Sequence, residues 1–187
     1  RYWEVWRYDY RFFRPIFAYA REHGLPVIGL NIDRDITSSV FKSGSLEKLT
    51  PEQKAQLPAE MRLDLEGYVE RLTQTHQMHG QGNHADGSLT GFIQAQALWD
   101  ETMAESISNY LKEHPDSGMI VLAGSQHTRK DSGIPPRVAA RMEVSQASVL
   151  NLATSRLSAT ELAKTTDYLF LLESYEFAPQ GKIGVVL

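Results

Sequence analysis

The stretch that decides the fold is MIVLAGSQHTRKDSGIPPRV, residues 119–138. Its first five residues are apolar and include β-branched side chains, which is typical of a buried strand. A glycine-bounded turn follows, with His127 and three charged residues at 129–131, and the proline pair 135–136 then favours the start of a helix. The stretch therefore predicts a strand, a polar turn and a helix in succession, as in an α/β fold.

The rest of the chain repeats this alternation. Short apolar runs predict strands at 26–31, 148–153 and 167–172. Apolar residues at helical spacing predict helices at 8–23, 92–114, 136–142 and 158–164. Strands separated by helices favour a mostly parallel sheet flanked by helices, which is the fold class that we expect.

The segment from about 33 to 89 lacks a comparable strand. It contains three predicted helices, at 35–41, 50–57 and 60–78. The second helix has a strong start signal, because Thr50, Pro51 and Gln53 supply an N-cap, a first-turn proline and a capping-box partner. We expect a helical insertion that forms a small lid subdomain within a single domain over residues 1–187.

Composition excludes some classes of function. The 187 residues carry a formal net charge of −4, so the broad basic face that nucleic-acid binding requires is not expected. The chain contains no cysteine, which excludes thiolate ligands and disulfides. No apolar run approaches the roughly 18 residues of a membrane span.

Two predicted strands end in polar residues. His127 follows the strand in 119–123, while Asn31 ends the strand at 26–31 and Arg34 comes three residues later. The carboxyl ends of parallel strands meet at one crevice, where ligands bind. With Glu101 from the long helix, these residues predict a hydrolase in which His127 is a general base or metal ligand, Glu101 its carboxylate partner, and Asn31 or Arg34 an oxyanion stabiliser. The alternative is that Asn31 caps a helix and His127 occupies an ordinary loop.

The lid carries its own candidate ligands. Tyr68 and His76 are eight residues apart and share a helix face, and His79 lies at the next turn. The run THQMHGQGNH, 75–84, adds His84, but its histidines match no strict metal-ligand spacing. A packing role for Tyr68 and solvated histidines are the alternative. A third possibility, an interaction module, rests on the aromatic residues Tyr2, Trp3, Trp6, Tyr8, Tyr10, Phe12 and Phe13.

Three segments together resemble a known family. LPVIGLNIDRDI (25–36), QAQALWDETMAESISNYL (94–111) and the stretch 119–138 are similar, in order and spacing, to the signature segments of the ChaN-like haem-binding proteins. That family belongs to a superfamily that also holds the TIKI and TraB proteins and the erythromycin esterases. The AG..H.....GIPPR pattern, residues 123–137, is the most specific part of the resemblance.

The resemblance implies a haem-binding protein of iron or haem uptake, which binds haem between the lid and the α/β core. It implies iron ligation by Tyr68 or His79, with His76, His127 and Arg34 as further cofactor-binding candidates. It also implies a homodimer on haem binding, with haem at the interface, and a periplasmic or outer-membrane lipoprotein of the bacterial cell envelope. The lipid anchor is then expected outside this chain. The superfamily's esterases and metal-dependent peptidase-like members are the basis of the hydrolase alternative.

The sequence also departs from the family pattern. The family's first strand, with a turn that contains glycine and histidine, is expected before residue 1, so that the chain is a fragment of the domain. Where relatives often have Gly-Asn before the histidine, this chain has Gly124-Ser125-Gln126-His127. Residues 181–187, GKIGVVL, resemble the start of a PDZ domain, which predicts a second domain from about residue 181.

Overall fold

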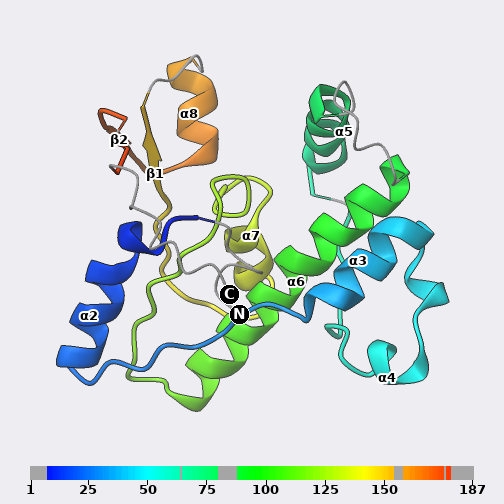
Figure 1. Cartoon of the computed structure of the whole chain (residues 1–187), viewed down its shortest axis with the longest axis horizontal. Coiled ribbons are helices and arrows are strands. Elements are labelled where there is room, and N and C mark those ends of the chain that lie inside the picture. The colour runs from blue at the N-terminus through cyan, green and yellow to red at the C-terminus, as the bar shows by residue number, and fades with distance from the viewer. Residues whose placement is uncertain (1–7, 64, 80–87, 154–157, 175, 178–187) are drawn as a thin grey trace, which may run out of the picture.

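The computed structural model describes residues 8–63, 65–79, 88–153, 158–174 and 176–177 (Figure 1). Its elements in chain order are η1 (Tyr10–Phe12), α2 (Arg14–Glu22), α3 (Arg34–Ser43), η2 (Leu46–Lys48), α4 (Pro51–Lys54), α5 (Tyr68–His79), α6 (Leu89–Glu113), α7 (Ile134–Ala139), β1 (Val149–Leu152), α8 (Ala159–Thr165) and β2 (Tyr168–Leu171). Among these described residues, no helix has both the length and the apolar character needed to cross a membrane.

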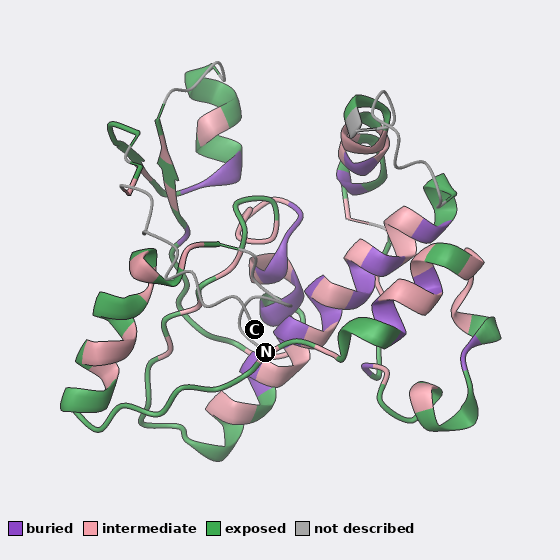
Figure 2. Cartoon of the chain, viewed as in Figure 1, coloured by how far each residue is buried: buried purple, intermediate pink, exposed green. Residues whose placement is uncertain are grey.

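Helix α6 organises the packing. It has 25 residues and begins at Leu89, after Ser88, whose side chain accepts a hydrogen bond from the backbone N–H of Gly91 and so caps the helix. Helices α3, α5 and α7 all contact it, and the buried residues gather along α6 and the helices beside it (Figure 2). Because α6 is covered on several sides, it buries residues around much of its circumference, including polar ones.

Apolar side chains fix the neighbours of α6. Ile36 and Val40 of α3 pack with Leu98, and a Cβ at Gly91 would clash with the carbonyl oxygen of Phe41, so this crossing requires glycine. Two further clusters join α6 to α5 and to α7, the first through Leu72 and Ala97. Burial of each large side chain contributes roughly 1.5–3 kcal/mol relative to exposure.

The two strands form a parallel pair joined through α8. Val149 is in register with Tyr168 and Leu152 with Leu171. Ser158 and Glu161 form a capping box at the start of α8. The strands predicted at 148–153 and 167–172 and the intervening helix are therefore confirmed. The chain mixes helices with a parallel sheet, which places it in the α/β class.

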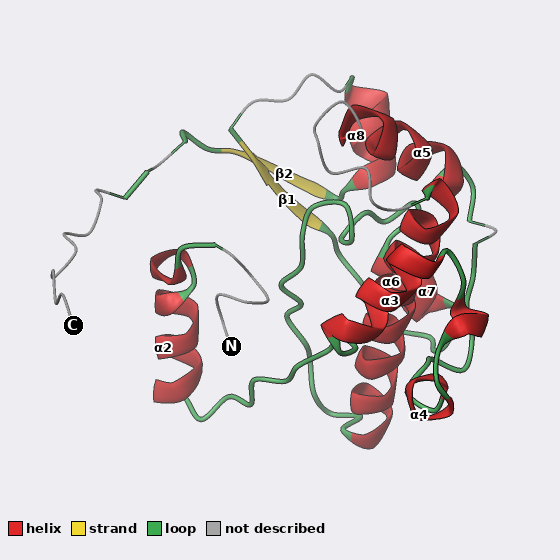
Figure 3. Ribbon diagram, turned by 45° about the vertical axis from the view of Figure 1, so that its right-hand side comes forward, coloured by secondary structure: helices red, strands yellow, loops and turns green. Residues whose placement is uncertain are grey.

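The strands predicted at 26–31 and 119–123 are loops (Figure 3). No backbone hydrogen bond links either segment to another strand in the described part of the chain, and a strand is stable only when its backbone is paired. In 119–123, Val121 packs on the cluster between α6 and α7, whereas Ile120 is 90% exposed. The segment therefore has the alternating exposure of a strand but lacks backbone hydrogen bonds to a neighbouring strand. The wider parallel sheet stays a prediction.

The predicted helices differ mainly at their ends. The capping box at Thr50 is confirmed by reciprocal hydrogen bonds with Gln53, but α4 ends at Lys54. The helix predicted at 60–78 begins at Tyr68, after Gly67 with a φ of 71°. The aromatic residues at 2, 3 and 6, His84 and the PDZ-like residues 181–187 lie outside the described residues.

Candidate functional site

The side chains of Asp100, Tyr68 and His127 come from three segments and meet at one face of α6. Asp100, on α6, accepts a hydrogen bond from the Tyr68 hydroxyl at 3.0 Å through its Oδ2 atom. Its Oδ1 atom lies 2.6 Å from Nδ1 of His127. Asp100 is 2% exposed and Tyr68 is 0% exposed, whereas the His127 side chain is 19% exposed. The carboxylate therefore orients an imidazole whose other nitrogen, Nε2, makes no hydrogen bond with the described residues.

The loop that carries His127 is held by its own backbone. The N–H of His127 donates to the carbonyl of Gly124 at 2.8 Å, and the His127 carbonyl accepts from the N–H of Ile134 at 2.7 Å. A Cβ at Gly133 would clash with the carbonyl oxygens of His127 and Arg129. The expected close backbone approach at Gly133 is therefore confirmed. The edge of Trp99 also contacts the imidazole, with ring centroids 5.9 Å apart.

Tyr68 lies behind this pair. It is the first residue of α5, and with Leu72 it packs on Ala97 of α6. Arg137 lies over its ring at 4.4 Å. Burial, reinforced by the Asp100 carboxylate, raises the pKa of the Tyr68 hydroxyl far above its usual value of 10.0. In this conformation the hydroxyl is a hydrogen-bond donor to Asp100.

Glu101, the next residue of α6, belongs to a different cluster. Its Oε1 atom accepts from Nε of Arg137 at 2.8 Å and from the backbone N–H of Arg62 at 2.9 Å. Its Oε2 atom lies 2.6 Å from Nη2 of Arg141, an ion pair without hydrogen-bond geometry. Arg137 also donates to the carbonyls of Ser132 and Gly133. Glu101 and Arg137 are both fully buried, and this cluster fastens α7 to α6.

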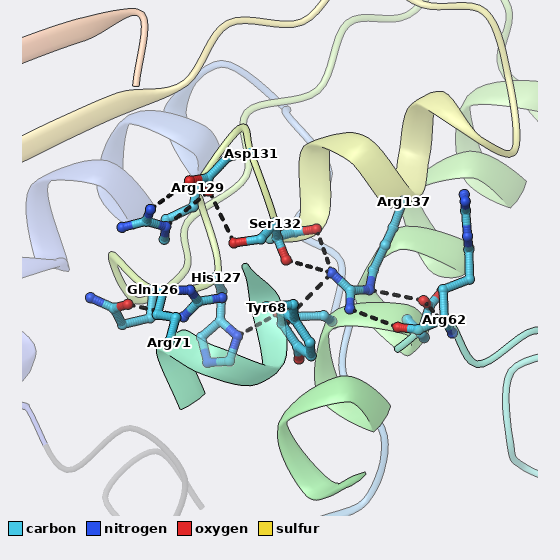
Figure 4. Close-up of polar contacts among 12 residues, drawn as sticks. Arg62, Tyr68, Arg71, Gln126, His127, Arg129, Asp131, Ser132 and Arg137 are labelled. Carbon is cyan, nitrogen blue, oxygen red and sulfur yellow. Dashed lines mark hydrogen bonds and ion pairs between the residues drawn. The ribbon is translucent and has the colours of Figure 1, made fainter. Parts of the chain in front are cut away.

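Two more arginines lie near His127 (Figure 4). Arg129 makes a two-pronged ion pair with Asp131, with Nε–Oδ1 at 2.9 Å and Nη2–Oδ2 at 2.5 Å. Arg71, on α5, donates from Nη1 to Oε1 of Gln126 at 3.0 Å. Burial, followed by the charge of Arg129, lowers the pKa of the Arg71 guanidinium. Two guanidinium groups and two carboxylates, those of Asp100 and Asp131, therefore lie around His127.

The structure separates the other predicted site residues. Asn31 is exposed, and its Oδ1 accepts from the backbone N–H of Ile32, while Arg34 is the exposed first residue of α3. His76 is half-buried, with its ring 5.4 Å from that of Phe92. His79 ends α5, and its side chain lies outside the described part of the chain. Neither Asn31 nor His76 contacts His127 among the described residues.

The carboxylate at His127 comes from Asp100, one position before the predicted Glu101. A helix turns by 100° per residue, so neighbouring acidic residues face different partners. The sequence signal that points to Asp100 is the spacing of the small residues around it. Ala97 and Ala104 lie three and four residues from Asp100 and are fully buried, so its face of the helix allows close approach by other segments. Arg137 is the last residue of the GIPPR segment of the resemblance, although its role as the partner of Glu101 was not predicted, and Arg71 had no sequence signal beyond its charge.

The open space at this site is small. A cavity of about 80 Å³ lies beside the His127 loop and is lined by residues that include Gln126, Arg129 and Leu150. Within the described ranges, no group of three or more His, Asp or Glu side chains is arranged to hold a bare metal ion. The donor set is therefore one oriented imidazole, aromatic rings and arginines. This set fits haem, whose iron binds imidazole and whose propionates bind arginine.

Comparison with known proteins gives the family. The family described as "Haem-binding uptake, Tiki superfamily, ChaN" matches residues 1–138. Searches of curated proteins and of solved structures found no significant match to this chain. The family match covers more than half of the 187 residues and includes both Asp100 and His127. The chain belongs to this family of haem-binding uptake proteins.

Proposed function

We propose that this member of the ChaN family binds haem for uptake, with Nε2 of His127 as the iron-binding atom. The observation that supports the proposal is the 2.6 Å contact between Asp100 Oδ1 and His127 Nδ1. Metal-binding histidines typically donate their second ring nitrogen to a carboxylate, which fixes the tautomer and increases the basicity of the ligating nitrogen. In this proposal Asp100 thus holds the proton on Nδ1 of His127 and leaves Nε2 available to bind a metal.

Bound haem supplies an iron centre that accepts an axial nitrogen and an apolar macrocycle that needs cover. The residues of this chain perform the other tasks. Asp100 keeps the proton on Nδ1, Trp99 limits rotation of the imidazole, and Tyr68 holds the second oxygen of Asp100. In this proposal Tyr68 and the lid histidines His76 and His79 are not the first iron ligand. Ligation by Tyr68 stays a prediction that substitution can decide.

The proposal includes a lid and a dimer. The cavity of about 80 Å³ beside the His127 loop is smaller than a porphyrin and is not lined by His127, so in this proposal the macrocycle lies on the surface of the chain. A second copy of the chain, with the helical segment 33–89 as a lid, would cover the other face of the macrocycle. The wider parallel sheet, the envelope location and the lipid anchor stay predictions from the resemblance.

A haem titration tests the proposal. We expect a saturable Soret band, and a loss of at least tenfold in affinity, with a changed spectrum, in the His127→Ala variant. His114→Ala is the matched control, because His114 is an exposed histidine whose Nδ1 contacts the carbonyl of Tyr110 at the end of α6. The absence of binding in a protein that is folded by circular dichroism would refute the proposal, as would unchanged binding in His127→Ala.

The same pair of residues supports hydrolysis as a second candidate. A carboxylate that orients an imidazole is also the arrangement of a general base. In this reading Asp100 takes the role predicted for Glu101, and His127 activates a water or a hydroxyl group. Hydrolysis of p-nitrophenyl esters that is lost in both His127→Ala and Asp100→Asn would favour this function if haem does not bind.

A further inference from the structure

Arg71 holds an unusual position beside the His127 loop. Its Nη1 atom donates to Gln126, the residue before His127, and its guanidinium carbon lies 5.3 Å from the centre of the Tyr68 ring. Its Nε and Nη2 atoms are buried and have no hydrogen-bond partner among the described residues. Buried guanidinium donors in folded proteins are almost always paired, so an acceptor is needed here.

The two unpaired atoms have a definite geometry. Nε and Nη2 lie on one edge of the guanidinium plane and point in parallel, which matches the two oxygens of a carboxylate. Two other arginines in this chain use the same edge for that purpose. Arg129 binds Asp131 through Nε and Nη2, and Arg11 binds Asp9 with Nε 3.1 Å from Oδ1 and Nη2 2.6 Å from Oδ2.

The charges around Arg71 also favour an anion. Arg129 is close enough for its charge to lower the pKa of Arg71. The nearby carboxylates are already engaged, since Asp131 binds Arg129 and Asp100 binds both Tyr68 and His127. An anion at Arg71 would reduce the repulsion between the two guanidinium groups.

We infer that the Nε–Nη2 edge of Arg71, beside Arg129, is a carboxylate-binding site next to His127. The inference rests on the proposed function, under which the carboxylate is a propionate of the haem held by His127. Gln126 is exposed and holds Arg71 by one neutral hydrogen bond. A carboxylate makes stronger charge-assisted bonds, so it can replace Gln126 and draw the guanidinium edge toward the ligand.

Metal-free protoporphyrin and its dimethyl ester test the inference, because neither needs an iron ligand and only the first has free carboxylates. We expect the wild-type chain to bind the diacid at least tenfold more tightly than the ester by fluorescence titration. Arg71→Gln removes this difference, and Arg71→Lys keeps only part of it, since an ammonium lacks the two-pronged geometry. Arg21→Gln, at an exposed arginine of α2, is the control and keeps the full difference.

The outcomes of these titrations distinguish a failure of the carboxylate site at Arg71 from a failure of the proposed haem binding. Equal binding of diacid and ester, together with haem binding that needs His127, would overturn the carboxylate site and leave the proposed function standing. Without any haem or porphyrin binding, the proposed function fails, and titration with acetate and inorganic phosphate decides the site. Thermal stabilisation by acetate that is lost in Arg71→Gln would then support a site for free carboxylates, and its absence would overturn the inference. If Arg71→Gln does not fold, the ester comparison and Arg71→Lys still give the answer.

Discussion

Asp100 and Glu101 are consecutive buried carboxylates of α6 whose nearest partners differ, although Arg137 lies within reach of both, 2.8 Å from Glu101 and 3.8 Å from Asp100. Asp100 contacts a tyrosine hydroxyl and an imidazole that is partly open to solvent. Glu101 contacts the guanidinium groups of Arg137 and Arg141, on the side where α7 packs. The first carboxylate leaves one ring nitrogen of its partner available, while the second is enclosed by cations and a backbone N–H.

The difference shows how one helix can carry two functions. A rotation of 100° between consecutive residues directs Asp100 toward α5 and the His127 loop and Glu101 toward α7. An enclosed ion pair stabilises the fold only while both charges are present, because one charge alone in the interior is strongly unfavourable. An oriented imidazole with a free nitrogen contributes little to stability and is suited to a ligand.

Glu101→Gln is expected to have the largest effect of the substitutions considered. It removes the carboxylate nearest to the buried Arg137 and leaves only Asp100, at 3.8 Å, as a counter-charge, so we expect a loss of about 3 kcal/mol in the free energy of unfolding, measured by urea denaturation. Glu113→Gln, at the exposed end of α6, is the control and should change the free energy by less than about 0.5 kcal/mol.

The double variant Glu101→Met with Arg137→Met sharpens this test. Replacing both charges with apolar side chains of similar volume should recover part of the lost stability, because no fully buried charge loses its nearest partner and only Arg141, at the edge of the cluster, loses its ion pair. A Glu101→Gln variant as stable as the wild type would contradict the structural role of the cluster. The contrast with Asp100 would then have no basis.

Asp100→Asn is expected to act mainly on the ligand. The amide keeps the size of the carboxylate but lowers the basicity of His127 and weakens control of its tautomer, so haem affinity should fall by about 10- to 100-fold. Glu101→Gln is the matched control and should leave haem affinity nearly unchanged at temperatures where it is folded. Equal losses of affinity in the two variants would break the comparison.

Sequence patterns predicted the local elements of the fold well. The start signal at Thr50, the helix end near residue 23 and the pair of apolar runs at 148–153 and 167–172 all depend on neighbouring residues. The segments 26–31 and 119–123 have the apolar pattern of strands but no paired backbone in the described residues. A pattern of side chains cannot show whether a hydrogen-bonding partner lies alongside.

The candidate site was predictable only in part. His127 could be found, because a histidine directly after an apolar run and before Gly133 and two prolines is an unusual arrangement. Its carboxylate partner depends on a rotation of 100° within α6, and two adjacent acidic residues do not reveal which of them faces the loop. The position of Arg71 depends on its hydrogen bond to Gln126, which lies 55 residues later in the sequence. A local sequence pattern cannot predict such a contact.

Tyr68→Phe decides whether Tyr68 binds the haem iron or only supports Asp100 by a hydrogen bond. As a support, Tyr68 gives Asp100 one hydrogen bond, so its loss should cost about 1 kcal/mol of stability and leave the haem spectrum unchanged. The raised pKa of the hydroxyl means that the folded state keeps its proton above pH 10 while the unfolded state loses it. Stability of the wild type should therefore fall more steeply above pH 10 than that of the variant. Loss of the spectrum would identify Tyr68 as the iron ligand.

Asp167→Asn is expected to have the smallest effect. It tests whether His127 is positioned by Asp100 of α6 or by the hydrogen bonds that join its loop to the strands. Asp167 joins the His127 loop to the strands, since it accepts from Lys130 at 2.7 Å and from the N–H of Ser148 at 2.8 Å. These hydrogen bonds, that of Lys130 first, lower the pKa of its carboxyl below 3.8. A lowered pKa adds stability above pH 3.8 that disappears as the pH falls further, so denaturation curves of variant and wild type should differ at pH 7 and converge in acid. Haem affinity at pH 7 should stay unchanged, because the buried Asp100 holds the imidazole directly, and a tenfold loss would show that the outer link positions His127 instead.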